Sequence, residues 1–146
     1  MIRNERQYRI TKRAAERFRH ALQTLRDRVD DDLHPMLRTA HEAAIKSQLA
    51  DLEADIAAYE ALASGEPVVL ELDSFGELPE TLIRARIAVG LTQRQLAERL
   101  GLKEQQIQRY EATNYSSASM ERVGQVIEAL GIEVREQVAV PARAAS

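Results

Sequence analysis

The sequence predicts a mainly α-helical protein in which an N-terminal antiparallel helical hairpin precedes a small helical domain flanked by short β-strands. Apolar residues recur at intervals of three and four along the first 64 residues, which is typical of packed helices. Proline and glycine delimit shorter helical segments farther along, and two stretches alternate with the period of a strand. The expected organisation is a hairpin at 1–64, a connector at 65–78, a helical domain at 79–131 and a C-terminal strand and tail at 132–146.

The first helix of the hairpin is expected to begin at Thr11, because a threonine hydroxyl can cap the free N–H groups of a helix start. The apolar residues behind it fall on one helical face: Ala15, Phe18, Leu22, Leu25 and Val29. The acidic run at 30–32 interrupts this pattern, and Pro35 suits the first turn of a second helix. Ser64 and Gly65 supply its stop signal.

The second helix carries apolar residues along its whole length, namely Leu37, Ala40, Ala44, Ile45, Leu49, Leu52, Ile56, Tyr59 and Leu62. One hairpin cannot cover such a stripe on both sides. We therefore expect the hairpin to pack on the rest of the chain, on a second copy of itself, or on another protein.

Two stretches have the pattern of short strands. One is 68–72, and in the other Ile132, Val134, Val138 and Val140 alternate with less apolar residues. Isolated strands leave backbone groups unpaired, so the two are expected to pair with each other, within one chain or between chains.

Charge and composition narrow the classes of function. The chain has 20 basic and 23 acidic residues. It has no cysteine, and the absence of cysteine excludes disulfides, thiolate nucleophiles and cysteine-based zinc sites. Residues 79–132 hold 7 basic and 6 acidic groups, so nucleic-acid binding would have to rest on local contacts. No signal peptide or membrane-spanning run is recognisable, so we expect a cytoplasmic protein with no membrane partner.

Residues 78–102 contain the signals of two helices joined by a sharp turn. Pro79 lies at the first position of one helix and Gly90 follows its end, after which Thr92 caps the next helix. That helix ends at Gly101, where a residue that tolerates positive φ permits an abrupt change of direction. Ala97 leaves room for two crossing helices to approach.

Ile107 is placed to fill the angle between these helices, and with Ala97 and Gly101 it defines a helix-turn-helix. The run from Gly90 to Leu102, continued by Ile107-Gln108-Arg109-Tyr110-Glu111, resembles the Xre/Cro family of lambda-repressor-like transcriptional regulators. The resemblance covers about a third of the chain and implies that the second helix of the motif enters the major groove of double-stranded DNA.

The resemblance also implies roles for individual residues. Those expected to face the bases are Glu104, Gln105 and Arg109, with Gln106 and Gln108 as further candidates. Those expected at phosphates are Thr92, Gln93 and Lys103, joined in the following loop by Asn114, Tyr115 and Ser116. Arg86 and Glu111 match a structural salt bridge of the family.

Two departures from the family's pattern indicate modest affinity per monomer. Glu104 repels phosphate unless it accepts a hydrogen bond from cytosine, and residues 112–117 lack basic groups that would hold the DNA backbone. We therefore expect a repressor that binds a palindromic operator as a homodimer, since two half-sites supply the missing discrimination.

Other functions stay open. One alternative is an antitoxin-like regulator, which would bind a toxin-like partner through the hairpin and repress its own operon through the helix-turn-helix. A second alternative is that the helix-turn-helix domain, which is nearly neutral in charge, makes only protein contacts. Enzymatic activity is not expected. His41-Glu42 begins like a zinc-protease helix, but Ile45 occupies the second histidine position, so neither a metal nor a cofactor is indicated.

Overall fold

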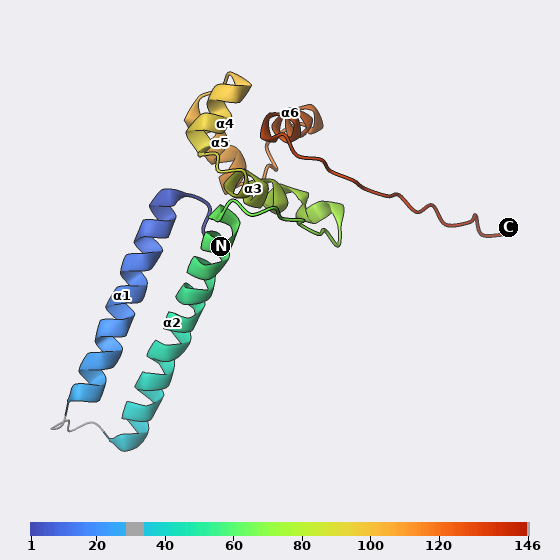
Figure 1. Cartoon of the computed structure of the whole chain (residues 1–146). Helices are drawn as coiled ribbons and strands as arrows, with labels where there is room; N and C mark the ends of the chain where they lie inside the picture. The colour runs from blue at the N-terminus through green and yellow to red at the C-terminus, as the bar shows by residue number, and fades with distance from the viewer. Residues whose placement is uncertain (29–33, 146) are drawn as a thin grey trace.

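The computed structural model describes residues 1–28 and 34–145, and all regular secondary structure within these ranges is helical (Figure 1). The elements in chain order are α1 (Glu5–Asp27), α2 (Pro35–Ala63), the 3-10 turn η1 (Phe75–Glu77), α3 (Leu78–Ala88), α4 (Gln93–Leu100), α5 (Glu104–Ala112) and α6 (Met120–Leu130). The predicted mainly helical fold and its N-terminal hairpin are confirmed.

Helices α1 and α2 form the hairpin, which projects from the group of helices α3 to α6 (Figure 1). Its interior is apolar and includes the buried residues Ala15, Leu25, Ile45 and Leu49. Two ion pairs also cross it, Arg19–Glu53 at 2.9 Å and Arg26–Glu42 at 3.2 Å. Such largely exposed pairs contribute at most about 1 kcal/mol, so apolar burial holds the helices together. The predicted stripe residue Val29 and the acidic run 30–32 lie outside the described residues.

The expected start of α1 at Thr11 was wrong. The helix begins after Asn4, whose side-chain oxygen accepts a hydrogen bond of 2.9 Å from the backbone N–H of Gln7. Thr11 lies inside α1, and its hydroxyl donates to the carbonyl of Gln7 at 2.9 Å. A hydroxyl that can cap a helix can also bond the preceding turn from within it, and the second use applies here.

Helix α2 has two distinct faces, which the single predicted stripe had merged. Ile45 and Leu49 are buried toward α1, whereas Leu37, Ala40 and Ala44 are exposed. The opposite side is a regular row of exposed, mostly small residues that we call the small-residue face. Its members, at intervals of four and three, are Met36, Ala40, Ala43, Ser47, Ala50, Ala54, Ala57 and Ala61.

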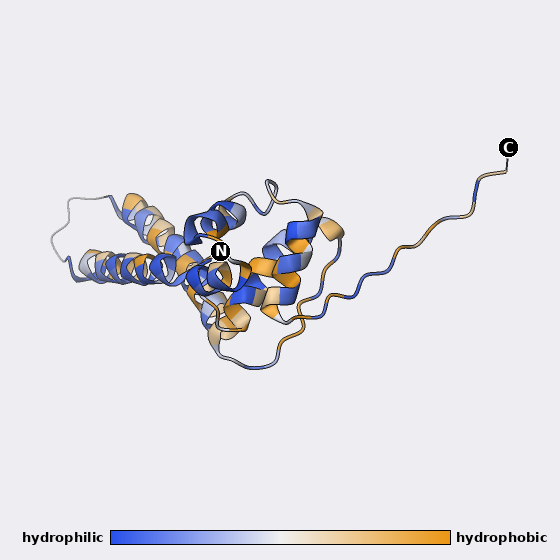
Figure 2. Cartoon of the chain, turned by 90° about the horizontal axis from the view of Figure 1, so that it is seen from above, coloured by the Kyte–Doolittle hydropathy of each residue, from blue (hydrophilic) through white to orange (hydrophobic). Residues whose placement is uncertain are grey.

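The C-terminal helices share one core. It contains Ile83 from α3, Leu96 from α4, Ile107 from α5 and Val126 from α6, all fully buried. The end of α2 packs against α3, and Tyr59 covers part of the same core. The apolar residues of α3 to α6 accordingly turn toward one another, with polar residues outside (Figure 2).

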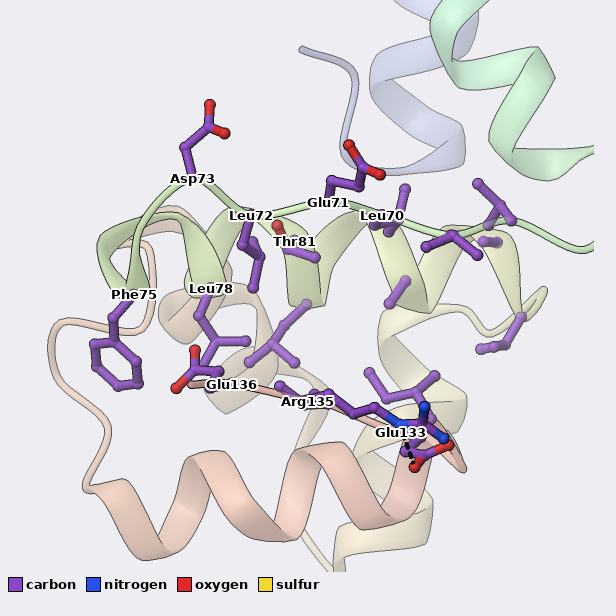
Figure 3. Close-up of a pocket in the computed structure, with 18 of the residues that line it drawn as sticks. Leu70, Glu71, Leu72, Asp73, Phe75, Leu78, Thr81, Glu133, Arg135 and Glu136 are labelled. Carbon is purple, nitrogen blue, oxygen red and sulfur yellow. Dashed lines mark hydrogen bonds and ion pairs between the residues drawn. The ribbon is translucent and has the colours of Figure 1, made fainter. Parts of the chain in front are cut away.

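The two predicted strands were wrong: among the described residues, the stretches from 66 and from 132 are extended but form no strand. Each stretch lies along α3, and a groove separates the two stretches (Figure 3). Alternate side chains pack against the helical core: Leu70 and Leu72 from the first stretch and Val134 from the second. The alternation of apolar and polar residues along these stretches therefore arises because only one side of each stretch packs against a helix. Farther on, the tail leaves the body, and Val138 is 88% exposed.

Candidate nucleic-acid interface

Helices α4 and α5 meet at the turn that the sequence predicted. The Thr92 hydroxyl accepts from the backbone N–H of Gln95 at 3.1 Å, and the Gln95 side chain accepts from the Thr92 N–H at 2.9 Å, so α4 begins with a reciprocal cap. Gly101 ends it with φ of +66°. Ala97 and Ile107 are fully buried in the angle between the helices. A small residue, a left-handed glycine and an aliphatic residue thus fix α5 rigidly against α4.

The outer face of α5 carries the five side chains expected to face bases: Glu104, Gln105, Gln106, Gln108 and Arg109, all exposed. Gln106 accepts from the backbone N–H of Lys103 at 3.3 Å and so helps to start the helix. Gln108 donates to Glu104 at 3.3 Å. Within the described ranges, the side chains of Gln105 and Arg109 have no hydrogen-bond or ion-pair partner, which leaves their donors available.

Residues expected at phosphates divide into exposed and internal ones. Thr92, Lys103, Asn114 and Ser116 are exposed. Gln93 is 8% exposed, and its amide donates to a carboxylate oxygen of Glu111 at 2.7 Å. Its side chain is thus engaged inside the protein, whereas its backbone N–H lies at the start of α4, where helix geometry leaves such groups unbonded.

Arg86 and Glu111 form a buried ion pair at the centre of the domain. The Nε of Arg86 lies 2.5 Å from one carboxylate oxygen of Glu111, and its Nη2 lies 2.9 Å from the other. The guanidinium also donates to the carbonyls of Leu91 at 2.7 Å and Arg3 at 2.6 Å. Both residues are at most 2% exposed, and the two charged groups hydrogen-bond each other, so this pair joins α3 to α5.

The N-terminal residues take part in this network, which the sequence alone did not reveal. Ile2 is 4% exposed, and the side chain of Arg3 donates to the backbone carbonyl of Glu111. Asn4 donates to the side-chain oxygen of Gln93 at 3.5 Å. The spacing of Asn4 and Gln7 is a local pattern that indicates a helix start. It does not predict contacts of residues 2–4 with partners more than 80 residues away in the sequence.

The loop after α5 contains two consecutive residues with an unusual backbone conformation. Asn114 and Tyr115 have φ of +47° and +55°, in the left-handed region. Tyr115 is 3% exposed, its ring stacks on Tyr110 with centroids 5.9 Å apart, and its hydroxyl has no partner among the described residues. Burial raises the pKa of the Tyr115 hydroxyl, and the Glu111 carboxylate raises it further. The side chain therefore belongs to the core of the domain.

We expect Tyr115→Phe to leave DNA affinity unchanged and to raise the free energy of unfolding by up to about 1 kcal/mol, because it removes a buried hydroxyl without a partner. Urea denaturation and a DNA titration of the same preparation measure both quantities. Asn114→Gly is the matched comparison, since it removes the exposed neighbouring side chain and glycine tolerates the left-handed backbone there. Weaker DNA binding confined to Tyr115→Phe would restore Tyr115 as a phosphate contact.

Two further properties of the chain bear on other functions. In residues 1–28 and 34–145, no helix has both the length and the apolar character required to span a bilayer. The same ranges contain no group of three or more histidines and carboxylates placed to hold a metal ion.

Comparison with known proteins agrees with this geometry. A family model described as helix-turn-helix matches residues 82–137, which run from within α3 through α6 to the start of the C-terminal tail. Searches of curated proteins and of solved structures gave no match. A domain of this family implies DNA binding. Residues 82–137 are therefore a helix-turn-helix domain of the Xre/Cro type.

Proposed function

We propose that this protein is a transcriptional repressor that binds a palindromic operator as a homodimer, with α5 of each copy in the major groove. The observation that carries the proposal is the exposed pair Gln105 and Arg109, whose available donors stand on a helix held rigidly by the turn at Gly101. Glutamine matches the edge of adenine and arginine that of guanine, each through two hydrogen bonds. Bound at a promoter, such a dimer would exclude RNA polymerase sterically.

The near-neutral charge of the helix-turn-helix region supports binding as a dimer. With 7 basic and 6 acidic residues in 79–132, one copy offers little general attraction to phosphate. Linking two half-site contacts in one particle raises affinity by a factor of about 10² to 10⁴ without any new contact. Two-fold symmetry also fits the spacing of one DNA turn between half-sites.

The small-residue face of α2 supports a specific place for the dimer contact. Its intervals of four and three repeat from Met36 to Ala61, which is the spacing that keeps one seam of a helix against a partner helix over many turns. Alanine and serine side chains are short, so they allow two helices to approach closely. We place the second copy's α2 against this face.

We expect Arg109→Ala to relax base preference at one operator position per half-site, and to weaken binding to the preferred base by about 1–3 kcal/mol. Lys103→Ala removes the same charge from the exposed start of α5 and should weaken binding to all sequences alike. The measurement is selection of bound fragments from sheared genomic DNA, followed by titration of the selected duplex and its single-base variants.

The same experiment tests the proposal as a whole. A wild-type protein that enriches no fragment at any salt concentration would contradict sequence-specific binding. A change in base preference with Lys103→Ala equal to that with Arg109→Ala would contradict the assignment of Arg109 as a base contact. Repression is tested separately, by placing the selected fragment before a reporter gene.

A further inference from the structure

A row of arginines lies on the outer face of α1. Its members are Arg6, Arg9, Arg13 and Arg17, spaced by three and four residues, and all are exposed. They lie on the side of α1 opposite the buried residues Ala15 and Leu25, which face α2. None has a carboxylate within ion-pair distance among the described residues. We call this row the arginine stripe.

The stripe is the most basic part of the chain. Residues 1–19 hold 7 basic and 2 acidic groups, whereas the helix-turn-helix region at 79–132 is nearly balanced. Farther along α1 the arginines are neutralised, since Arg19 and Arg26 pair with Glu53 and Glu42 of α2. The unneutralised charge is therefore concentrated at the end of α1 that meets the helix-turn-helix domain.

The stripe begins beside α5. Arg6 and Ile10 line a groove whose other walls include Thr92 at the start of α4 and Glu104 and Gln108 on α5. A recognition helix in the major groove has the phosphate backbone passing along its flanks. The first turns of α1 are therefore positioned where that backbone would run.

The position of α1 relative to α5 is fixed by partly buried contacts. The Arg3 carbonyl accepts from Arg86 at 2.6 Å, and the Arg3 side chain reaches the Glu111 carbonyl at the end of α5. The ring of Tyr8 also stacks on Tyr59 of α2 with centroids 4.9 Å apart, and Tyr59 in turn packs against the core of the C-terminal helices. A cationic helix held in place before binding loses little conformational freedom when it meets phosphate.

We propose that the arginine stripe binds the DNA phosphate backbone beside the base pairs that α5 reads, so that the hairpin extends the DNA-binding surface beyond the helix-turn-helix domain. This inference rests on the proposed function, since it takes α5 to lie in the major groove. Arginine suits the role because its planar fork of donors matches phosphate oxygens. The stripe supplies affinity without base preference.

The test compares two full-length variants in which the same amount of positive charge is removed, Arg6→Gln with Arg9→Gln, and Arg135→Gln with Arg143→Gln in the extended tail. Each is titrated by fluorescence anisotropy against the selected operator duplex and a random-sequence duplex over a range of salt concentrations. Glutamine keeps helix propensity, and circular dichroism with thermal melting verifies that both variants fold.

With the stripe pair changed, the slope of log K against log salt should fall by about 0.9 for each phosphate that the variant no longer neutralises. The fall should be the same on both duplexes, and the ratio of operator to random affinity should stay unchanged. The tail pair should keep the wild-type slope. Equal slopes for wild type and the stripe pair would overturn the inference and favour an acidic protein as the partner of this face.

A different result is expected if the inference holds but the protein does not bind a specific operator. In that case the wild-type protein shows no preference for any fragment, yet the random-sequence duplex still reports whether the stripe contacts phosphate. A wild-type protein that binds neither duplex at low salt overturns both the inference and the proposed function.

Discussion

Glu111→Ala is expected to lower the free energy of unfolding by about 3–5 kcal/mol, measured by urea denaturation of the full chain. The substitution leaves the guanidinium of Arg86 buried without its counter-charge, and it removes the acceptor of the Gln93 amide. Since small domains are stable by only about 5–15 kcal/mol, the variant should be largely unfolded at moderately raised temperature.

The matched control replaces both partners, Arg86→Met with Glu111→Leu. No charge is then stranded, and buried ion pairs exchanged for apolar residues of similar volume are often neutral in stability. The double variant should therefore be more stable than Glu111→Ala, although the carbonyls of Leu91 and Arg3 are left without a donor. A double variant less stable than the single one would show that these carbonyl hydrogen bonds outweigh the stranded charge.

Ala50→Glu combined with Ala54→Glu is expected to separate the proposed dimer and to lower affinity for the full operator by about 10² to 10⁴. Both alanines are exposed on the small-residue face of α2, so each chain should keep its fold. Across the proposed contact, the new carboxylates of both copies would meet in a narrow seam lined by alanine. Affinity for a single half-site should change little, because α5 is untouched.

Light scattering at several concentrations measures the mass, and titration of one-half-site and two-half-site duplexes measures affinity. The control is Thr24→Glu with Gln48→Glu, which adds the same charge at exposed positions of the hairpin away from this face. A wild-type chain that is monomeric at all concentrations would contradict a dimer through α2. It would favour the antitoxin-like alternative, in which a different protein covers the hairpin.

The helix-turn-helix was predictable because its signals are local. The cap at Thr92, the left-handed turn at Gly101 and the small residue Ala97 each act within a few residues of the chain, and all three do in the structure what their chemistry indicates. The ion pair between Arg86 and Glu111 was anticipated only through the family resemblance. No local pattern relates two residues 25 positions apart.

The errors arose where one pattern fits two structures. A threonine hydroxyl bonds a helix start or the preceding turn equally well, which displaced the predicted start of α1 from Asn4 to Thr11. Alternating apolar residues at 132–140 suit a strand, yet contact with one side of a helical core produces the same alternation in Ile132 and Val134. The internal position of the Gln93 side chain depends on partners that lie far away in the sequence.

The docking of residues 2–4 also determines when the fold can be completed during synthesis. Arg3 leaves the ribosome before its partners Arg86 and Glu111, which lie 83 and 108 residues later in the chain. The hairpin can form early from contacts between neighbouring helices, whereas its N-terminal anchor must wait until α5 has emerged. Closing such long loops is slow compared with helix formation. The emergence of Glu111 from the ribosome is therefore the point at which residues 2–4 can first be joined to the helix-turn-helix domain.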